Sequence, residues 1–149
     1  MSTGAEPADL IDALTRMSSF VQGTLERCAA EHDISAPQAR LLRALDDGRA
    51  PTMKELAQLL GLDKSSISGL VDRAQQRGLV RRVASQLDRR SVRVRLTGEG
   101  RDLAERLSAL FGEEIAVILG PLSQHERAAL ATSMTRLLAQ PSSSRARSV

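Results

Sequence analysis

Four arginines stand within seven residues of the segment DRRSVRVRLT, which covers residues 88–97. They are Arg89, Arg90, Arg93 and Arg95, and Asp88 is the acidic residue beside them. A guanidinium group can donate two parallel hydrogen bonds to a phosphate or a carboxylate. This density of arginines therefore indicates contact with an anion. The alternative is that they only keep an exposed edge strand from aggregating.

The basic residues of the chain are concentrated around this segment. Between Lys64 and Arg101 there are ten Lys or Arg and three Asp or Glu, a net charge of +7, whereas the remaining residues carry a net charge of −4. A surface that is only solvated more often mixes its charges. A basic block between acidic flanks is typical of a protein that binds a polyanion, and nucleic acid is the leading candidate.

Residues suited to other chemistries are few. The chain has two histidines and neither a glycine-rich phosphate loop nor a nucleophile motif, so the sequence argues against an enzyme. Cys28 and His32 have the i, i+4 spacing of two metal ligands, but only His125 and carboxylates remain to complete a site. Because zinc sites need three or four nitrogen or sulfur ligands, we expect no metal and no other cofactor.

Composition predicts one domain of 149 residues with an aliphatic core, since Phe20 and Phe111 are the only aromatic residues. The apolar runs are far shorter than the roughly 20 residues that span a bilayer, and the N-terminal segment does not resemble a secretory signal. The single cysteine excludes an internal disulfide and suits a reducing compartment. We therefore expect a cytoplasmic protein without a membrane partner.

Capping signals divide the chain into helices. Capping boxes, in which a hydroxyl residue precedes Glu or Gln by three positions, occur at Ser35–Gln38, Thr52–Glu55 and Ser123–Glu126. Asp63 and Thr97 are two further N-caps. These signals predict helices over residues 9–30, 36–45, 53–60, 64–77, 98–119 and 124–140, and strands over residues 79–84 and 92–96. We expect flexible ends at residues 1–8 and 141–149.

The segment 53–77 has the form of a helix, the turn GLD and a second helix. Ala57 and Gly61 are small, as two steeply crossing helices require. An apolar stripe would bury one side of the second helix, and it consists of Ile67, Leu70, Val71 and Ala74. The opposite side carries Ser65, Ser68, Gly69, Asp72, Arg73 and Gln76. This short, polar side suits insertion into the major groove of DNA.

A basic hairpin follows these two helices at once, with its strands joined by SQLDRRS. Strand alternation places Val92, Val94 and Leu96 on the core side of the second strand. Arg93 and Arg95 then point away, either toward an anion or only into solvent. A helix-turn-helix followed by such a hairpin is a winged helix. The fold class expected is therefore mainly α with a small β-hairpin wing.

The segments MKELAQLLGLDKSSISGLVDRAQQRGLVRR and LDRRSVRVRLTGEGRDL resemble the MarR family of multiple antibiotic resistance regulators. The resemblance covers residues 10–138 and includes the Asp-x-Arg of the wing and the Leu-Thr-x-x-Gly that begins a long helix. It implies a homodimeric transcriptional repressor or activator that binds double-stranded DNA. The implied domains are a flexible N-terminus at 1–8, a dimerisation helix at 9–34, a DNA-binding domain at 35–97, dimerisation helices at 98–140 and a disordered tail at 141–149.

The resemblance also implies roles for individual residues. In the second helix of the motif, the DNA-binding residues would be Lys64, Ser65, Ser66, Ser68, Arg73 and Gln76. At the wing, Asp88 would orient the arginines, while Arg90 would enter the minor groove. Arg89 would meet a phosphate. A winged helix that binds another protein is the main alternative, but it would need neither the +7 block nor a small polar face.

In relatives of this family a small molecule can bind between the dimerisation helices and the winged helix and shift the dimer away from its DNA-competent spacing. The sequence does not identify such an effector, and a pocket built on aromatic stacking is not expected without Tyr or Trp. Cys28 is a candidate effector or redox site, because Arg27 and His32 would favour its thiolate. Alternatively, Cys28 is a small buried hydrophobic residue.

Overall fold

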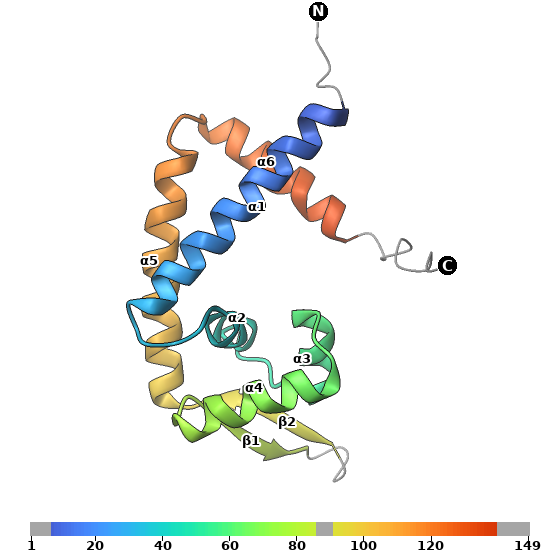
Figure 1. The fold of residues 1–149 in the computed structure, drawn as a ribbon, viewed down its shortest axis with the longest axis vertical. Helices are drawn as coiled ribbons and strands as arrows, with labels where there is room; N and C mark the ends of the chain where they lie inside the picture. Colours follow the sequence, from blue (N-terminus) through green and yellow to red (C-terminus); the bar gives the residue numbers. More distant parts are fainter. Residues whose placement is uncertain (1–6, 86–90, 140–149) are drawn as a thin grey trace, which may run out of the picture. The chain divides into compact units, whose positions relative to one another are not determined.

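The computed structural model describes residues 7–85 and 91–139, in which all the expected elements are present. Figure 1 shows a mainly helical fold with one antiparallel hairpin. The elements are α1 (Pro7–Ala30), α2 (Ala36–Leu45), α3 (Met53–Leu60), α4 (Lys64–Gln76), β1 (Val80–Ala84), β2 (Val92–Leu96), α5 (Gly98–Leu119) and α6 (Gln124–Leu138). The predicted fold class is therefore confirmed.

The boundaries follow the capping signals closely. All three predicted capping boxes form, and Asp63 caps α4 as expected. At the start of α5, the Thr97 hydroxyl accepts a hydrogen bond from the Gly100 amide at 3.0 Å. Four boundaries differ from the prediction by one or two residues: α1 begins at Pro7, β1 begins at Val80, α6 ends at Leu138, and α4 ends one residue early because Gly78 adopts a left-handed φ of 72°. The predicted tail at 141–149 lies outside the described residues.

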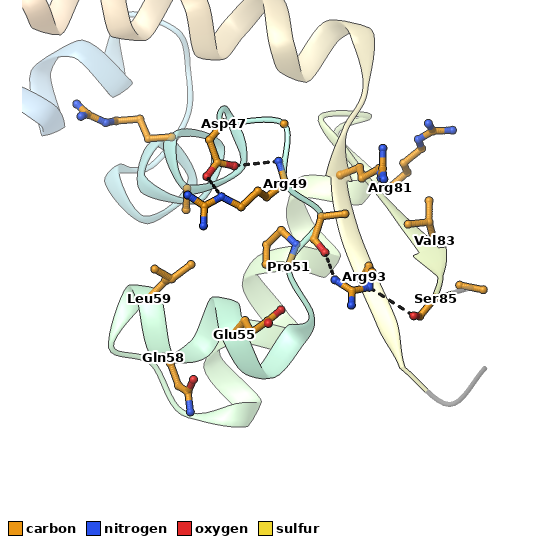
Figure 2. A pocket seen from close by; sticks show the side chains of 16 residues that line it. Asp47, Arg49, Pro51, Glu55, Gln58, Leu59, Arg81, Val83, Ser85 and Arg93 are labelled. Carbon is orange, nitrogen blue, oxygen red and sulfur yellow. Dashed lines mark hydrogen bonds and ion pairs between the residues drawn. The ribbon is translucent and has the colours of Figure 1, made fainter. Parts of the chain in front are cut away.

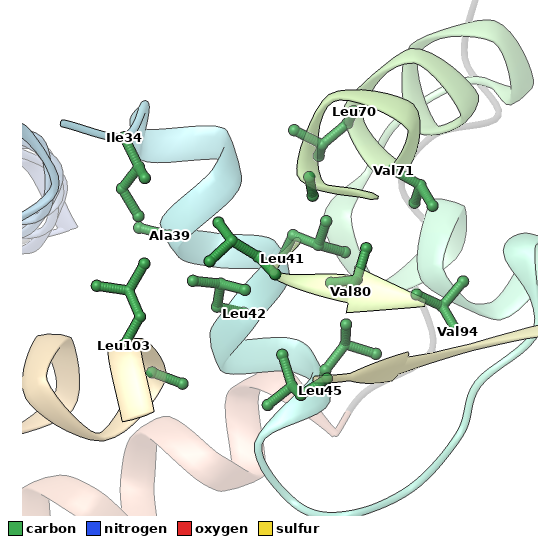
Figure 3. Packing of buried hydrophobic residues seen from close by; sticks show 14 of the residues in the cluster. Ile34, Ala39, Leu41, Leu42, Leu45, Leu70, Val71, Val80, Val94 and Leu103 are labelled. Atoms are coloured by element: carbon green, nitrogen blue, oxygen red, sulfur yellow. The ribbon is translucent and has the colours of Figure 1, made fainter. Parts of the chain in front are cut away.

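The chain divides into two compact units, of which the first covers Met1–Glu113. This unit holds a core that is almost entirely aliphatic, with side chains from α2, α4, the hairpin and α5 meeting in Figure 3. α2 lies at its centre, since Leu41, Leu42 and Leu45 are all buried. The apolar stripe predicted for α4 is buried as well. The core therefore holds α4 with its opposite face outward.

The hairpin pairs β1 with β2 in a register that runs from Val80–Leu96 to Ala84–Val92. Val94 and Leu96 are buried as predicted, but the expectation that Val92 faces the core is wrong, since it is 41% exposed. The reason is its place in the register. Val92 pairs with the exposed Ala84 at the end of the described strands, where the hairpin extends past the core.

The second unit covers Glu114–Val149 and contains the end of α5 and the whole of α6. The Ser123 capping box begins α6, and the Arg127 side chain donates to the carbonyls of Gly120 and Leu122 in the preceding turn. No residue of α6 is buried. Leu137 and Leu138 are exposed, as are Val117 and Ile118 at the end of α5. Among the described helices, none has the length and apolar character needed to cross a bilayer.

Candidate nucleic-acid interface

The turn between α3 and α4 fixes the direction in which α4 leaves. α3 begins at the Thr52 capping box and ends at Gly61, which has the left-handed angles φ 65° and ψ 33° expected of a small residue at this position. After this reversal the Leu62 amide donates to the Ala57 carbonyl at 2.9 Å. The helix-turn-helix predicted from the sequence is therefore formed, and Gly61 is the residue at which the chain turns.

The start of α4 is organised by the carboxylate of Asp63. It accepts hydrogen bonds from the Ser66 amide at 2.7 Å, from the Ser65 hydroxyl at 2.8 Å and from the Ser66 hydroxyl at 3.0 Å. The Ser66 amide, followed by the two hydroxyls, holds the pKa of Asp63 below its ordinary value. The Ser65 and Ser66 hydroxyls therefore act as hydrogen-bond donors to the Asp63 carboxylate. Their remaining lone pairs can accept from a base amino group.

The polar face of α4 is presented to solvent, as predicted. Lys64, Ser65, Ser66, Arg73 and Gln76 are exposed and Ser68 is half-buried. These are the six residues of α4 that the sequence assigned to DNA binding, and they lie on one helix with an apolar opposite side. Because the core holds that opposite side, the polar face keeps a fixed orientation. The arrangement suits a helix that docks into a groove of DNA.

A small hollow lies within this polar face. It has a volume of about 330 Å³ and is lined by Pro37, Leu62, Ser65, Ser66, Gly69, Leu70 and Arg73. Sequence reasoning missed Pro37 and Leu62, because Pro37 comes from α2 and no local pattern links it to α4. A Cβ atom on Gly69 would lie 3.2 Å from Nη1 of Arg73. Arg73 therefore lies back along the helix, over the space that glycine leaves.

The hairpin is joined to α4 by Arg82 of β1. Its guanidinium forms an ion pair with Asp72 at 2.8 Å and donates to the Gln75 side-chain oxygen at 2.9 Å. Sequence reasoning placed Asp72 on the DNA-facing side and gave Arg82 no role. The structure instead assigns both residues to the junction between helix and wing.

Arg93 and Arg95 lie on the same side of β2, away from the core, but their burial and hydrogen bonding differ. Arg95 is exposed, whereas Arg93 is half-buried and donates to the Ala50 carbonyl at 2.7 Å and to the Ser85 hydroxyl at 3.4 Å. Arg93 also forms a β-bridge with Thr52, so the segment before α3 lies beside β2. A purely solubilising role therefore does not describe Arg93. It fastens the hairpin to the chain that precedes α3.

Three predicted wing residues, Asp88, Arg89 and Arg90, lie outside the described residues. Cys28 lies in the described part, at 2% exposure within the apolar core. This position fits the alternative in which Cys28 is a small hydrophobic residue, and its role as a sensor stays a prediction. The described residues contain no group of three or more His, Cys, Asp or Glu side chains that could hold a metal.

The fold and this interface together define a winged helix-turn-helix protein. A family model described as the MarR family matches residues 32–91. Over 135 residues the chain is 30% identical to the HTH-type transcriptional regulator PecS of Dickeya dadantii (strain 3937), covering 89% of this chain and 81% of PecS. The chain therefore belongs to the MarR family of DNA-binding transcriptional regulators, which are not enzymes.

Solved structures show the same fold. A mutant of MarR from E. coli, complexed with operator DNA, is 25% identical with a TM-score of 0.68, covering 90% of this chain and 99% of that chain. The PcaV transcriptional regulator from Streptomyces coelicolor, in complex with its natural ligand, is 26% identical with a TM-score of 0.65, covering 93% of this chain and 97% of that chain. One relative was thus solved with operator DNA and another with a ligand.

Proposed function

We propose that this protein represses transcription as a homodimer that binds a pseudo-palindromic operator. The observation that carries the proposal is the exposed polar face of α4, which the core holds outward and Arg82 joins to the wing. The complex of MarR from E. coli with operator DNA supports it. In this proposal residues 35–97 bind DNA, while residues 9–34 and 98–140 form the dimer.

Two groups of residues contact the duplex in this proposal. The first group enters the major groove and consists of Lys64, Ser65, Ser66, Ser68, Arg73 and Gln76. The second group belongs to the wing, where Arg90 enters the minor groove, Arg89 meets a phosphate and Asp88 orients both. The net charge of +7 between Lys64 and Arg101 supports this assignment, because it supplies the cations that phosphates require.

Exposed apolar side chains support the homodimer. Leu10, Ile11 and Leu14 of α1 are each more than half exposed, and Val117 and Leu138 are exposed further along the chain. Leu10, Ile11 and Leu14 lie within about one turn of the same helix, and clustered apolar side chains in contact with water often mark an interface. A second copy of the chain would bury these residues if its helices packed against them. The segments that carry them are those assigned to dimerisation.

A small-molecule effector would modulate the affinity for DNA. The structure of PcaV in complex with its natural ligand supports this part of the proposal. Such a ligand acts only if it binds the DNA-competent and DNA-incompetent states with different affinities.

Selection of bound sites from random duplexes tests the proposal directly. We expect a palindrome with half-sites about 10 base pairs apart. Affinity for that site should fall steeply with salt, with a log–log slope of about −0.9 for each phosphate contact. The variant Arg90→Ala should lose about 1–3 kcal/mol of binding free energy, while the control Arg106→Ala on α5 should bind like the wild type. A salt-independent affinity, or no duplex binding, would contradict the proposal.

Sedimentation of charge variants tests the dimer. The double variant Ile11→Glu/Leu14→Glu should sediment as a monomer, because two carboxylates in an apolar interface would be buried without partners. The control Ser19→Glu changes an exposed polar residue of the same helix and should remain dimeric. A wild-type monomer at all concentrations would refute the dimer.

A further inference from the structure

An arginine-lined groove lies on the side of the hairpin that faces away from α4 (Figure 2). The groove has a volume of about 1330 Å³ and is formed by the end of α2, the loop that follows it, α3, β1 and β2. Its lining includes Arg49, Arg81, Arg93 and Arg95. The individual roles proposed above include none of these four side chains, although Arg81, Arg93 and Arg95 count toward the net charge of +7.

Arg81 and Arg95 face each other directly across the two strands. Like charges in opposite positions of a strand pair destabilise the pairing. Both side chains are exposed, and among residues 7–85 and 91–139 no acidic side chain forms an ion pair with either. A bound anion between the two guanidinium groups would convert this repulsion into attraction, and each group could donate two hydrogen bonds to it.

The three other arginines that line the groove are already held by contacts, and Arg43 lies 4.8 Å from the centre of the Phe111 ring. Arg93 is held by the Ala50 carbonyl and the Ser85 hydroxyl, and Arg49 is paired with Asp47 at 2.7 Å. Figure 2 shows these contacts on the loop between α2 and α3 and on β2. The groove therefore has a fixed wall, while Arg81 and Arg95 remain available to a ligand.

The lining also includes aliphatic side chains, together with the carboxylates of Asp47, which pairs with Arg49, and Glu55, which accepts from the Thr52 amide at 2.7 Å. Val83 lies on the same side of the hairpin as Arg81 and Arg95, and Ala50 and Pro51 lie along the loop. Leu59 of α3 lines the groove as well and is 64% exposed, so its side chain is accessible to a ligand. No aromatic residue is among the lining residues. A ligand with an extended aliphatic body would bury this surface.

The groove and α4 lie on opposite faces of the hairpin. Residues alternate between the two faces of a strand, and the opposite face of the hairpin packs on the core through Val80 and Val94 and contacts α4 through Arg82. The groove residues therefore point away from α4. A ligand in the groove would therefore leave the polar face of α4 uncovered.

We propose that this groove binds an organic acid with an aliphatic body, its carboxylate between Arg81 and Arg95 and its chain along Val83 toward Leu59. The proposal goes beyond DNA binding and is tested in the absence of DNA. Octanoate is the probe. Acetate carries the carboxylate without the chain, and 1-octanol carries the chain without the charge, so each removes one half of the recognition.

Titration of the ¹⁵N-labelled full-length protein, followed by NMR, measures binding. Octanoate should shift the arginine Nε–H signals of Arg81 and Arg95 and the backbone amides of both strands. The variant Arg81→Ala/Arg95→Ala should bind octanoate about tenfold more weakly, and acetate and 1-octanol should each bind about tenfold more weakly to the wild type. The control Arg106→Ala lies outside the groove and should bind octanoate like the wild type.

Two further measurements keep the test independent of folding. Because the double variant removes a repulsion, its melting temperature should equal or exceed that of the wild type. Leu59→Ser, on a different element, should weaken octanoate but not acetate. The proposal is overturned if octanoate shifts other residues only, or if the double variant binds it unchanged. It is also overturned if octanoate does not bind and the double variant loses affinity for duplex DNA, since the groove then meets phosphate.

Discussion

Asp72 of α4 and Arg82 of β1 form an ion pair of 2.8 Å, which joins α4 to the hairpin. The two side chains are 52% and 30% exposed, so solvent screens much of their attraction. The Gln75 side chain accepts a second hydrogen bond from the same guanidinium. In the proposed complex, where α4 and the wing contact successive grooves of one duplex, this junction would set the angle between the two contacts.

A double-mutant cycle measures the junction. Asp72→Ala, Arg82→Ala and the double variant should give a coupling free energy of about 0.5 kcal/mol in urea unfolding. Each single variant should also bind the selected operator more weakly, because the wing loses its fixed angle. The exposed pair Asp12–Arg16 on α1 offers a matched control, since its removal should leave DNA binding unchanged. A cycle without coupling would show that backbone packing alone holds the wing.

The local parts of this fold could be predicted from sequence, and the junctions could not. Ser35, Thr52 and Ser123 cap helices through partners three residues away, so the pattern and the contact share one short segment. Gly61 was predictable for the same reason. By contrast, Arg93 binds a carbonyl 43 residues earlier, and no local pattern marks such a contact.

The candidate site shows the same division. The alternation of β2 correctly predicted that Val94 and Leu96 are buried. It wrongly predicted the same for Val92, because a strand pattern does not show where the core ends. The polar face of α4 followed from the helical period. The hollow in that face could not be predicted, since Pro37 reaches the face only through the packing of α2.

Gly69 tests whether Arg73 must lie along the helix to bind DNA. A Cβ on Gly69 would lie 3.2 Å from Nη1 of Arg73, the mobile end of a long side chain, so Gly69→Ala should fold normally. It should gain about 0.5–1 kcal/mol of stability, because alanine favours the helix. Operator affinity should fall by about 1 kcal/mol, roughly fivefold, as the guanidinium is displaced.

Gly112 provides the matched control for this substitution. It lies in α5, and a Cβ there would have no atom within 4 Å. Gly112→Ala should therefore gain similar stability without any change in DNA affinity. Fluorescence anisotropy with the selected operator gives the affinities, and urea unfolding gives the stabilities. If Gly69→Ala and Gly112→Ala bound the operator with equal affinity, Arg73 would not be a DNA-contacting residue.

The Asp63 cap of α4 predicts a dependence of stability on pH. The pKa of Asp63 is lowered from its ordinary value of 3.8 by the Ser66 amide and then by the Ser65 and Ser66 hydroxyls. A lowered pKa in the folded state means that the cap contributes stability above pH 3.8 and loses it as the pH falls through the lower value. Glu55 and Glu126 are lowered in the same direction by their own capping boxes.

Substitution isolates the contribution of Asp63 from those of the other two carboxyls. Asp63→Ala should lower the urea midpoint at pH 7, and its stability should fall less steeply than that of the wild type between pH 5 and pH 3. Asp63→Asn keeps an acceptor for the Ser66 amide without a charge. It should retain more stability than Asp63→Ala while losing the same pH dependence. An unchanged slope in both variants would show that this carboxyl is not the titrating group.

Gly100 makes the closest backbone approach among the glycines in the described part of the chain. A Cβ at this position would lie 1.8 Å from the carbonyl oxygen of Leu79, because the first turn of α5 runs directly against the start of β1. The same carbonyl accepts from the Thr97 amide at 3.1 Å, so it cannot move away without losing that bond. Gly100→Ala should therefore cost about 2–4 kcal/mol of unfolding free energy.

Gly98, two residues earlier in the same helix, separates this clash from a general effect of replacing glycine. A Cβ on Gly98 would meet no atom within 4 Å, so Gly98→Ala should be neutral or slightly stabilising in urea unfolding. The clash sits where the wing joins the long helix, so Gly100→Ala should also weaken operator binding at temperatures where it is still folded. If Gly100→Ala were as stable as Gly98→Ala, the strand and the helix could separate at no cost, and the wing would not be anchored at this end.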